Sequence, residues 1–141
     1  MGTPGSMGSA FQAGAAYFAL VFLVGFVLGA LRVLILIESV GAFWAVLAEL
    51  PVILTASWIV CGWTLRRFRV PAHRAHRLVM GGVAFILLIT AEVLLSAALG
   101  LSPGEYLASF RTPEGNLGLG GQIVFALFPW IRLRTATKRF A

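Results

Sequence analysis

Long runs of apolar residues, each interrupted by only a few polar positions, dominate the sequence. A membrane-spanning helix needs about 20 predominantly apolar residues, at a rise of about 1.5 Å each. Four segments approach or exceed that length, at residues 13–37, 40–65, 78–101 and 115–133. The fourth is the shortest and begins with several glycines. The pattern predicts an all-α polytopic membrane protein, in which a four-transmembrane-helix bundle forms a single domain.

Composition points to the same fold class. Hydrophobic residues make up 60% of the 141 residues and charged residues only 11%, whereas soluble domains carry about 25% charged residues. This balance excludes a soluble enzyme and a disordered chain. A net charge of +6 would indicate nucleic-acid binding in a soluble protein, but here the basic residues adjoin the apolar runs. We therefore expect the lipid bilayer to be their partner and expect no nucleic acid.

Nine of the eleven basic residues fall in two places. The first cluster, between the second and third segments, is expected to contact lipid headgroups and comprises Arg66, Arg67, Arg69, Arg74 and Arg77. The second consists of Arg132 and a basic tail over residues 134–141. Basic connections stay on the cytoplasmic side of the membrane, and the two clusters share a side only if there are four spans. We predict a multi-pass protein of a bacterial inner membrane with both termini cytoplasmic.

The first twelve residues have the features of neither a span nor a signal peptide. They are rich in Gly and Ser, and they contain no Lys or Arg that would form the n-region of a secretory signal. We expect residues 1–12 to be flexible, with either Met1 or Met7 as the true start.

The connection between the third and fourth segments carries the signals of a short helix. Ser102 is placed to cap it, with Pro103 at the first helical position and Glu105 three residues after the cap. Tyr106 and the apolar residues near it then favour a short interfacial outer helix. This helix either forms a lid over an outer cavity or is simply anchored by its aromatic residues at the headgroups.

Polar residues interrupt each apolar segment, and their depths agree. Arg32 lies about 8 Å from the outer end of the first segment, by helix rise. Glu49 and Glu92 lie about 13 Å from the outer ends of the second and third segments. Gln122 lies in the outer half of the fourth segment. Because ionisable groups inside a bilayer rarely face lipid, we predict an intramembrane polar cluster of these four residues.

Two glycines and a proline accompany this cluster. Gly25 and Gly29 share a helical stripe with Arg32, in a small-residue pattern that permits close helix packing. Pro51, two residues after Glu49, cannot donate to the helix ladder and is expected to kink the second segment. Such a kink is either ordinary for a span or loosens carbonyl groups to build a site, as in the broken helices of transporters.

One Arg among two Glu residues leaves one carboxyl group without a basic partner. Either that group carries a proton, or a cation or a partner chain balances its charge. Two functions follow. The first, which the sequence favours, is a non-enzymatic structural or accessory component of a bacterial inner-membrane complex, with partner membrane subunits. The second is a small proton-coupled transporter or channel, acting as a homo-oligomer, that uses Glu49 and Glu92 with Arg32.

Catalysis and metal binding lack the residues they need. His73 and His76 have helical spacing, but their loop offers no Cys, Asp or Glu, and the adjacent arginines would repel a metal ion. The sequence shows no nucleophile paired with a base and no phosphate-binding loop. We therefore predict no catalytic residues, no metal and no cofactor.

Overall fold

A computed structural model describes residues 6–140, with side chains as far as residue 134. The regular structure within that range is all helical. In chain order the elements are α1 (Met7–Leu31), the π-helical turn η1 (Arg32–Leu36), α2 (Ile37–Val40), α3 (Ala42–Arg67), α4 (Arg74–Ala98), α5 (Pro103–Ser109) and α6 (Pro113–Phe140). The predicted all-α class is confirmed.

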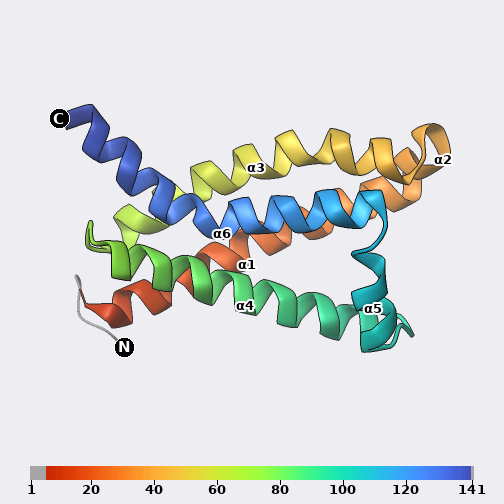
Figure 1. Ribbon diagram of the computed structural model, residues 1–141, viewed down its shortest axis with the longest axis horizontal. Coiled ribbons are helices and arrows are strands. Elements are labelled where there is room, and N and C mark those ends of the chain that lie inside the picture. The colour runs from red at the N-terminus through yellow and green to blue at the C-terminus, as the bar shows by residue number, and fades with distance from the viewer. Residues whose placement is uncertain (1–5, 141) are drawn as a thin grey trace.

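The four long helices of the described chain run up and down in one bundle (Figure 1). Helix α1 packs against α3 and α4, and α6 packs against the same two helices. The start of α1, the α3–α4 connection and the end of α6 lie together at one end, which we call the basic end (Figure 1). The turn η1 and helices α2 and α5 lie at the opposite end, which we call the α5 end (Figure 1).

Three helical stretches of the described chain are long and apolar enough to cross a membrane: Met7–Val40, Ala42–Arg67 and Arg74–Ala98. Their outward-facing apolar side chains include Leu34, which is 73% exposed, as expected for residues that meet lipid. The fourth predicted span, in α6, is not among them. Its apolar stretch is diluted by glycines, Gln122 and arginines near its end.

Helix α1 begins earlier than predicted. The side chain of Ser6 caps it, and Ala10, near its start, is fully buried in the core. Residues 7–12, which were expected to be flexible, are therefore helical, and the small side chains of Ser9 and Ala10 are buried against the bundle. Residues 1–5 lie outside the described residues. At the other terminus, residues 134–140 of the predicted tail continue α6.

The half of the bundle toward the basic end is closely packed. A Cβ atom at Gly81 of α4 would lie 1.9 Å from the carbonyl oxygen of Ala126 in α6. A Cβ atom at Gly14 of α1 would lie 2.7 Å from the carbonyl oxygen of Met80 in α4. Only glycine allows backbones to approach so closely. The buried core around these contacts includes Ala13, Tyr17, Cys61, Leu65, Ala84 and Phe125.

A proline in α6 is compensated by the helices around it. Pro129 has no N–H to donate to the carbonyl of Phe125, four residues earlier. The hydroxyl of Tyr17 in α1 donates to that carbonyl at 2.6 Å, and the Tyr17 and Phe125 rings stack with centroids 4.3 Å apart. Arg77 of α4 donates to the carbonyl of Pro129 at 3.0 Å. The proline therefore links three helices in the packed half.

The arginines predicted to contact headgroups divide into two groups. Most of them are exposed at the basic end: Arg66, Arg67, Arg69 and Arg74. Arg77 instead turns toward α6, where the carbonyl of Pro129 takes one of its hydrogen bonds. Arg132 of α6 also turns inward, because it donates to the carbonyl of Trp58 at 2.7 Å and lies over the Trp58 ring at 4.1 Å.

Candidate functional site

Toward the α5 end the helices separate around a cavity of about 860 Å³. Its walls come from all four long helices together with η1 and α5, and they are mostly apolar. Phe125 lines the cavity and also belongs to the packed core, so the cavity ends where that core begins. Small-molecule sites typically measure about 300–1,000 Å³ and combine apolar walls with a few polar groups. The cavity therefore has the size of a site for a small organic molecule.

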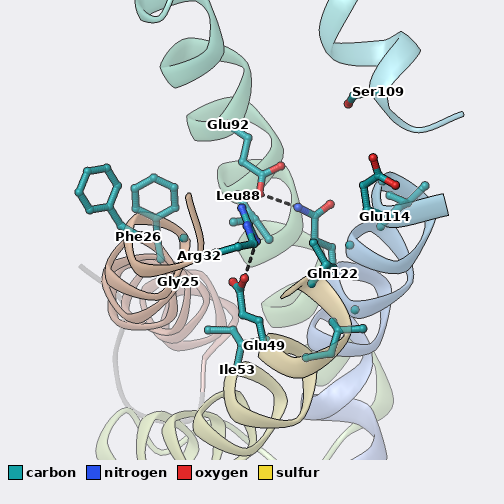
Figure 2. Close-up of a pocket in the computed structure, with 18 of the residues that line it drawn as sticks. Gly25, Phe26, Arg32, Glu49, Ile53, Leu88, Glu92, Ser109, Glu114 and Gln122 are labelled. Atoms are coloured by element: carbon teal, nitrogen blue, oxygen red, sulfur yellow. Dashed lines mark hydrogen bonds and ion pairs between the residues drawn. The ribbon is translucent and has the colours of Figure 1, made fainter. Parts of the chain in front are cut away.

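All four residues of the predicted polar cluster line this cavity (Figure 2). Arg32, at the start of η1, forms an ion pair with Glu49 of α3. The side chain of Glu49 is only 13% exposed. Figure 2 shows Arg32 between the two carboxyl groups, with its dashed contact running to Glu49. The ion pair thus joins the first helical stretch to α3.

Glu92 of α4 is held by neutral groups. The hydroxyl of Tyr106 donates to its Oε2 atom at 2.6 Å, and the Nε2 atom of Gln122 donates to its Oε1 atom at 2.6 Å (Figure 2). Among the residues whose side chains the structure describes, Glu92 forms no ion pair. Arg32, the basic residue of the cluster, is therefore paired with Glu49. Within that part of the chain, Glu92 has only uncharged hydrogen-bond partners.

Tyr106 is a member of the site that the sequence did not place there. Ser102 caps α5 as predicted, accepting the Glu105 amide at 3.1 Å. Because α5 begins after this cap, Tyr106 lies on its inner face and is buried, while Leu107 is 63% exposed. Burial, followed by its hydrogen bond to Glu92, raises the pKa of the Tyr106 hydroxyl above its ordinary range. Tyr106 therefore remains a protonated donor at neutral pH, and α5 covers part of the cavity.

The backbone of the site departs from the α-helix at Arg32. Helix α3 continues unbroken through Pro51, and Leu47, whose carbonyl loses its helical donor to that proline, does not line the cavity. The first helical stretch instead passes through η1, a single π-helical turn that begins at Arg32. Such turns are frequent at functional sites. A hydrophobic pattern with helical periodicity does not reveal one.

Gly25 and Gly29 leave space for the cavity and do not bring two helices into close backbone contact. Both line the cavity. A Cβ atom at Gly25 would lie 3.7 Å from the Cδ1 atom of Ile53, which is an ordinary contact. At Gly29 the neighbour at 3.7 Å is the guanidinium of Arg32, in the same helical stretch. Among the long helices, backbone approaches too close for a Cβ atom occur at Gly14 and Gly81 and not at the predicted pair.

Comparison with known proteins adds nothing to this geometry. No known protein family, no curated protein and no solved structure matches the chain. In the described residues, no group of three or more His, Cys, Asp or Glu side chains is placed to hold a metal ion.

Proposed function

We propose that α6 is the fourth span of the bundle and that the basic end faces the cytoplasm of a bacterium. Helix α6 has 28 residues and packs along α3 and α4, which are themselves apolar enough to span. A helix between two spans is in the bilayer with them. The exposed arginines at the basic end support the orientation, because basic connections are retained on the cytoplasmic side.

Cysteines introduced at Ala75 and Asn116 are expected to be labelled from opposite sides of the membrane. Both positions are exposed, Ala75 near the start of α4 and Asn116 in the first turn of α6. An impermeant maleimide should modify Asn116→Cys in intact spheroplasts and Ala75→Cys only after lysis. Both variants also carry Cys61→Ala, which removes the native, buried thiol. Modification of both variants in intact spheroplasts would refute four spans.

We propose that the protein is a small, non-enzymatic, proton-coupled carrier that binds its substrate in the cavity and exchanges a proton at Glu92. One observation supports this choice above all: Glu92 is in the cavity wall with neutral partners, while Arg32 is engaged by Glu49. Intramembrane carboxyl groups of this kind act as proton-exchange groups in carriers. A carboxyl group with a purely structural role would be expected in an ion pair, as Glu49 is.

The partners of Glu92 suit both of its protonation states. As a carboxylate, Glu92 accepts hydrogen bonds from Tyr106 and Gln122. After protonation it needs an acceptor, and a rotated Gln122 amide presents its carbonyl oxygen in the same place. A tyrosine hydroxyl can likewise donate or accept. The site can therefore gain or lose a proton without leaving Glu92 unsatisfied, which a carrier requires.

A structural or accessory role in a membrane complex is the second candidate. The Arg32–Glu49 pair joins two helices, as expected of a pair that fixes helix register. A bundle with only that role would be expected to close around its ion pair, because protein interiors are close-packed. The cavity therefore favours the carrier. Since the packed half blocks any pathway through one bundle, we further propose that the carrier acts as a homo-oligomer or with partner membrane subunits.

The carrier proposal predicts an exchangeable carboxyl proton on Glu92, whose infrared band is absent in Glu92→Gln. The C=O stretch in infrared difference spectra, recorded over a range around pH 7, measures this directly. Glu49→Gln should leave the band in place. The other ionisable groups that line the cavity are Arg32, Glu49, Tyr106 and Glu114. A band that survives in Glu92→Gln, or the absence of any titrating carboxyl band, would refute proton exchange at Glu92.

A further inference from the structure

The cavity has more acidic than basic side chains in its walls. Its lining, within the described residues, includes the carboxyl groups of Glu49, Glu92 and Glu114 and the single guanidinium of Arg32. Arg32 is paired with Glu49. In the described part of the chain, Glu92 and Glu114 have no ion-pair partner. Once Glu92 has released its proton, a cavity with such walls attracts a ligand of positive charge, because low-dielectric surroundings strengthen the field of unpaired carboxylates.

A second observation indicates a ligand with hydrogen-bond donors. The Oε1 atom of Gln122 is buried and has no hydrogen-bond partner among the described residues. The Nε2 atom of the same amide donates to Glu92, so the unused acceptor adjoins the carboxylate. Buried acceptors are almost always satisfied in native proteins. An N–H group beside Glu92 would satisfy this acceptor once the Gln122 side chain turns the oxygen toward the cavity.

The apolar walls indicate what the rest of the ligand looks like. The aromatic side chains of Phe22, Phe110 and Phe125 line the cavity together with Tyr106. Aromatic faces attract cations and also bury apolar groups. The lining therefore combines a small polar locus with a large apolar surface, which matches a compact apolar body that carries one cationic head group.

We propose that the ligand is a protonated organic amine with a compact apolar body, whose N–H groups bind Glu92 and the Oε1 atom of Gln122. This proposal rests on the carrier function proposed above. The amine enters as a monocation, the Glu92 carboxyl group releases its proton to water, and the resulting carboxylate pairs with the ammonium group. One positive charge enters for each proton that leaves, so the charge of the site is conserved.

Probes that share one body and differ in the head group test the ligand class. At neutral pH, 1-adamantanamine is a cation, 1-adamantanol is neutral and 1-adamantanecarboxylate is an anion. Calorimetric titration of the full-length protein in detergent should show the amine binding at least about tenfold more tightly than the other two. The N,N,N-trimethyl derivative keeps the charge but has no N–H, so it should bind less tightly than the amine. Equal affinity for the amine and the alcohol would overturn the proposal.

Variants locate the binding and control for charge. Glu92→Gln and Glu114→Gln should each weaken amine binding, by about tenfold at Glu92, and should leave adamantanol binding unchanged. Glu105→Gln is the matched control: Glu105 is exposed on α5 and does not line the cavity, and Gln also fits its capping position. Amine affinity that falls equally in Glu105→Gln and Glu92→Gln would mean that the amine responds to general surface charge, and the site would be refuted.

Proton release separates this proposal from the carrier function. Amine binding should acidify a weakly buffered solution in the native protein and not in Glu92→Gln. If the Glu92 carboxyl band titrates but the amine binds no better than the alcohol, the ligand class is wrong and proton exchange stands. If the amine binds selectively without proton release and no carboxyl band titrates, the ligand class stands and the carrier function is wrong.

Discussion

Arg32→Met is expected to destabilise the protein by about 3 kcal/mol, and adding Glu49→Gln is expected to restore most of that loss. Arg32 forms its ion pair with Glu49, whose side chain is 13% exposed. Without the guanidinium, that carboxylate remains largely desolvated and unpaired. Breaking a buried pair by removing one partner costs more than replacing both partners with neutral groups. The expected loss of stability lies toward the lower end of the range for buried ion pairs, because the Arg32 side chain itself is 29% exposed.

A second double variant identifies the partner of Arg32. Arg32→Met combined with Glu92→Gln should be no more stable than Arg32→Met alone, since Glu92 takes its hydrogen bonds from Tyr106 and Gln122. Thermal unfolding in detergent, followed by circular dichroism, compares all the single and double variants. Equal recovery with either carboxyl group replaced would show that Arg32 is shared between them, and the separation of a structural Glu49 from a proton-exchanging Glu92 would fail.

The depth of the polar residues could be predicted from the sequence because depth adds up along a helix. Each residue advances the helix by about 1.5 Å, so residue counting brings Arg32, Glu49, Glu92 and Gln122 to one level, where the structure places all of them in one cavity. The choice of partner depends on rotation about each helix axis and on side-chain reach. Neither quantity follows from counting, so the pairing of Arg32 with Glu49 alone was left open.

The contact faces of the helices were harder to predict for a different reason. In a soluble protein, polar residues mark the outer face of a helix, but in a membrane the face toward lipid is as apolar as the face toward the core. Gly14, Gly25, Gly29 and Gly81 therefore look equivalent in the sequence. In the structure, a Cβ atom at Gly81 would overlap a backbone oxygen, whereas one at Gly25 would make an ordinary contact. Only the three-dimensional packing separates them.

Tyr17 and Tyr106 illustrate contacts that local patterns cannot show. Tyr17 satisfies a carbonyl that Pro129 leaves without its helical donor, across 108 positions of the chain. Tyr106 reaches Glu92 from a separate short helix. A buried tyrosine hydroxyl usually has a hydrogen-bond partner, so the sequence signals that a partner exists but not which one. The tertiary fold supplies the partner in both cases.

Gly81→Ala is expected to lower stability by about 1–3 kcal/mol, while Gly82→Ala is expected to raise it by about 0.5–1 kcal/mol. A Cβ atom at Gly81 would lie 1.9 Å from the carbonyl oxygen of Ala126, whereas a Cβ atom at Gly82 meets nothing within 4 Å in the described structure. Backbone cannot rotate aside as a flexible side chain can, so α4 and α6 must separate to accept the first substitution. The second only removes the entropic cost of a glycine in a helix.

The two neighbouring glycines form a matched pair, because the same atoms are added at adjacent positions of one helix. Thermal unfolding in detergent should give opposite shifts in melting temperature for the two variants. If both variants are stabilised, α4 and α6 do not meet at Gly81. The amine titration then adds a functional readout: Gly81→Ala disturbs the packed half that ends the cavity and should weaken amine binding, while Gly82→Ala should leave it unchanged. Unchanged binding in a destabilised Gly81→Ala variant would show that the packed half supports the fold without shaping the cavity.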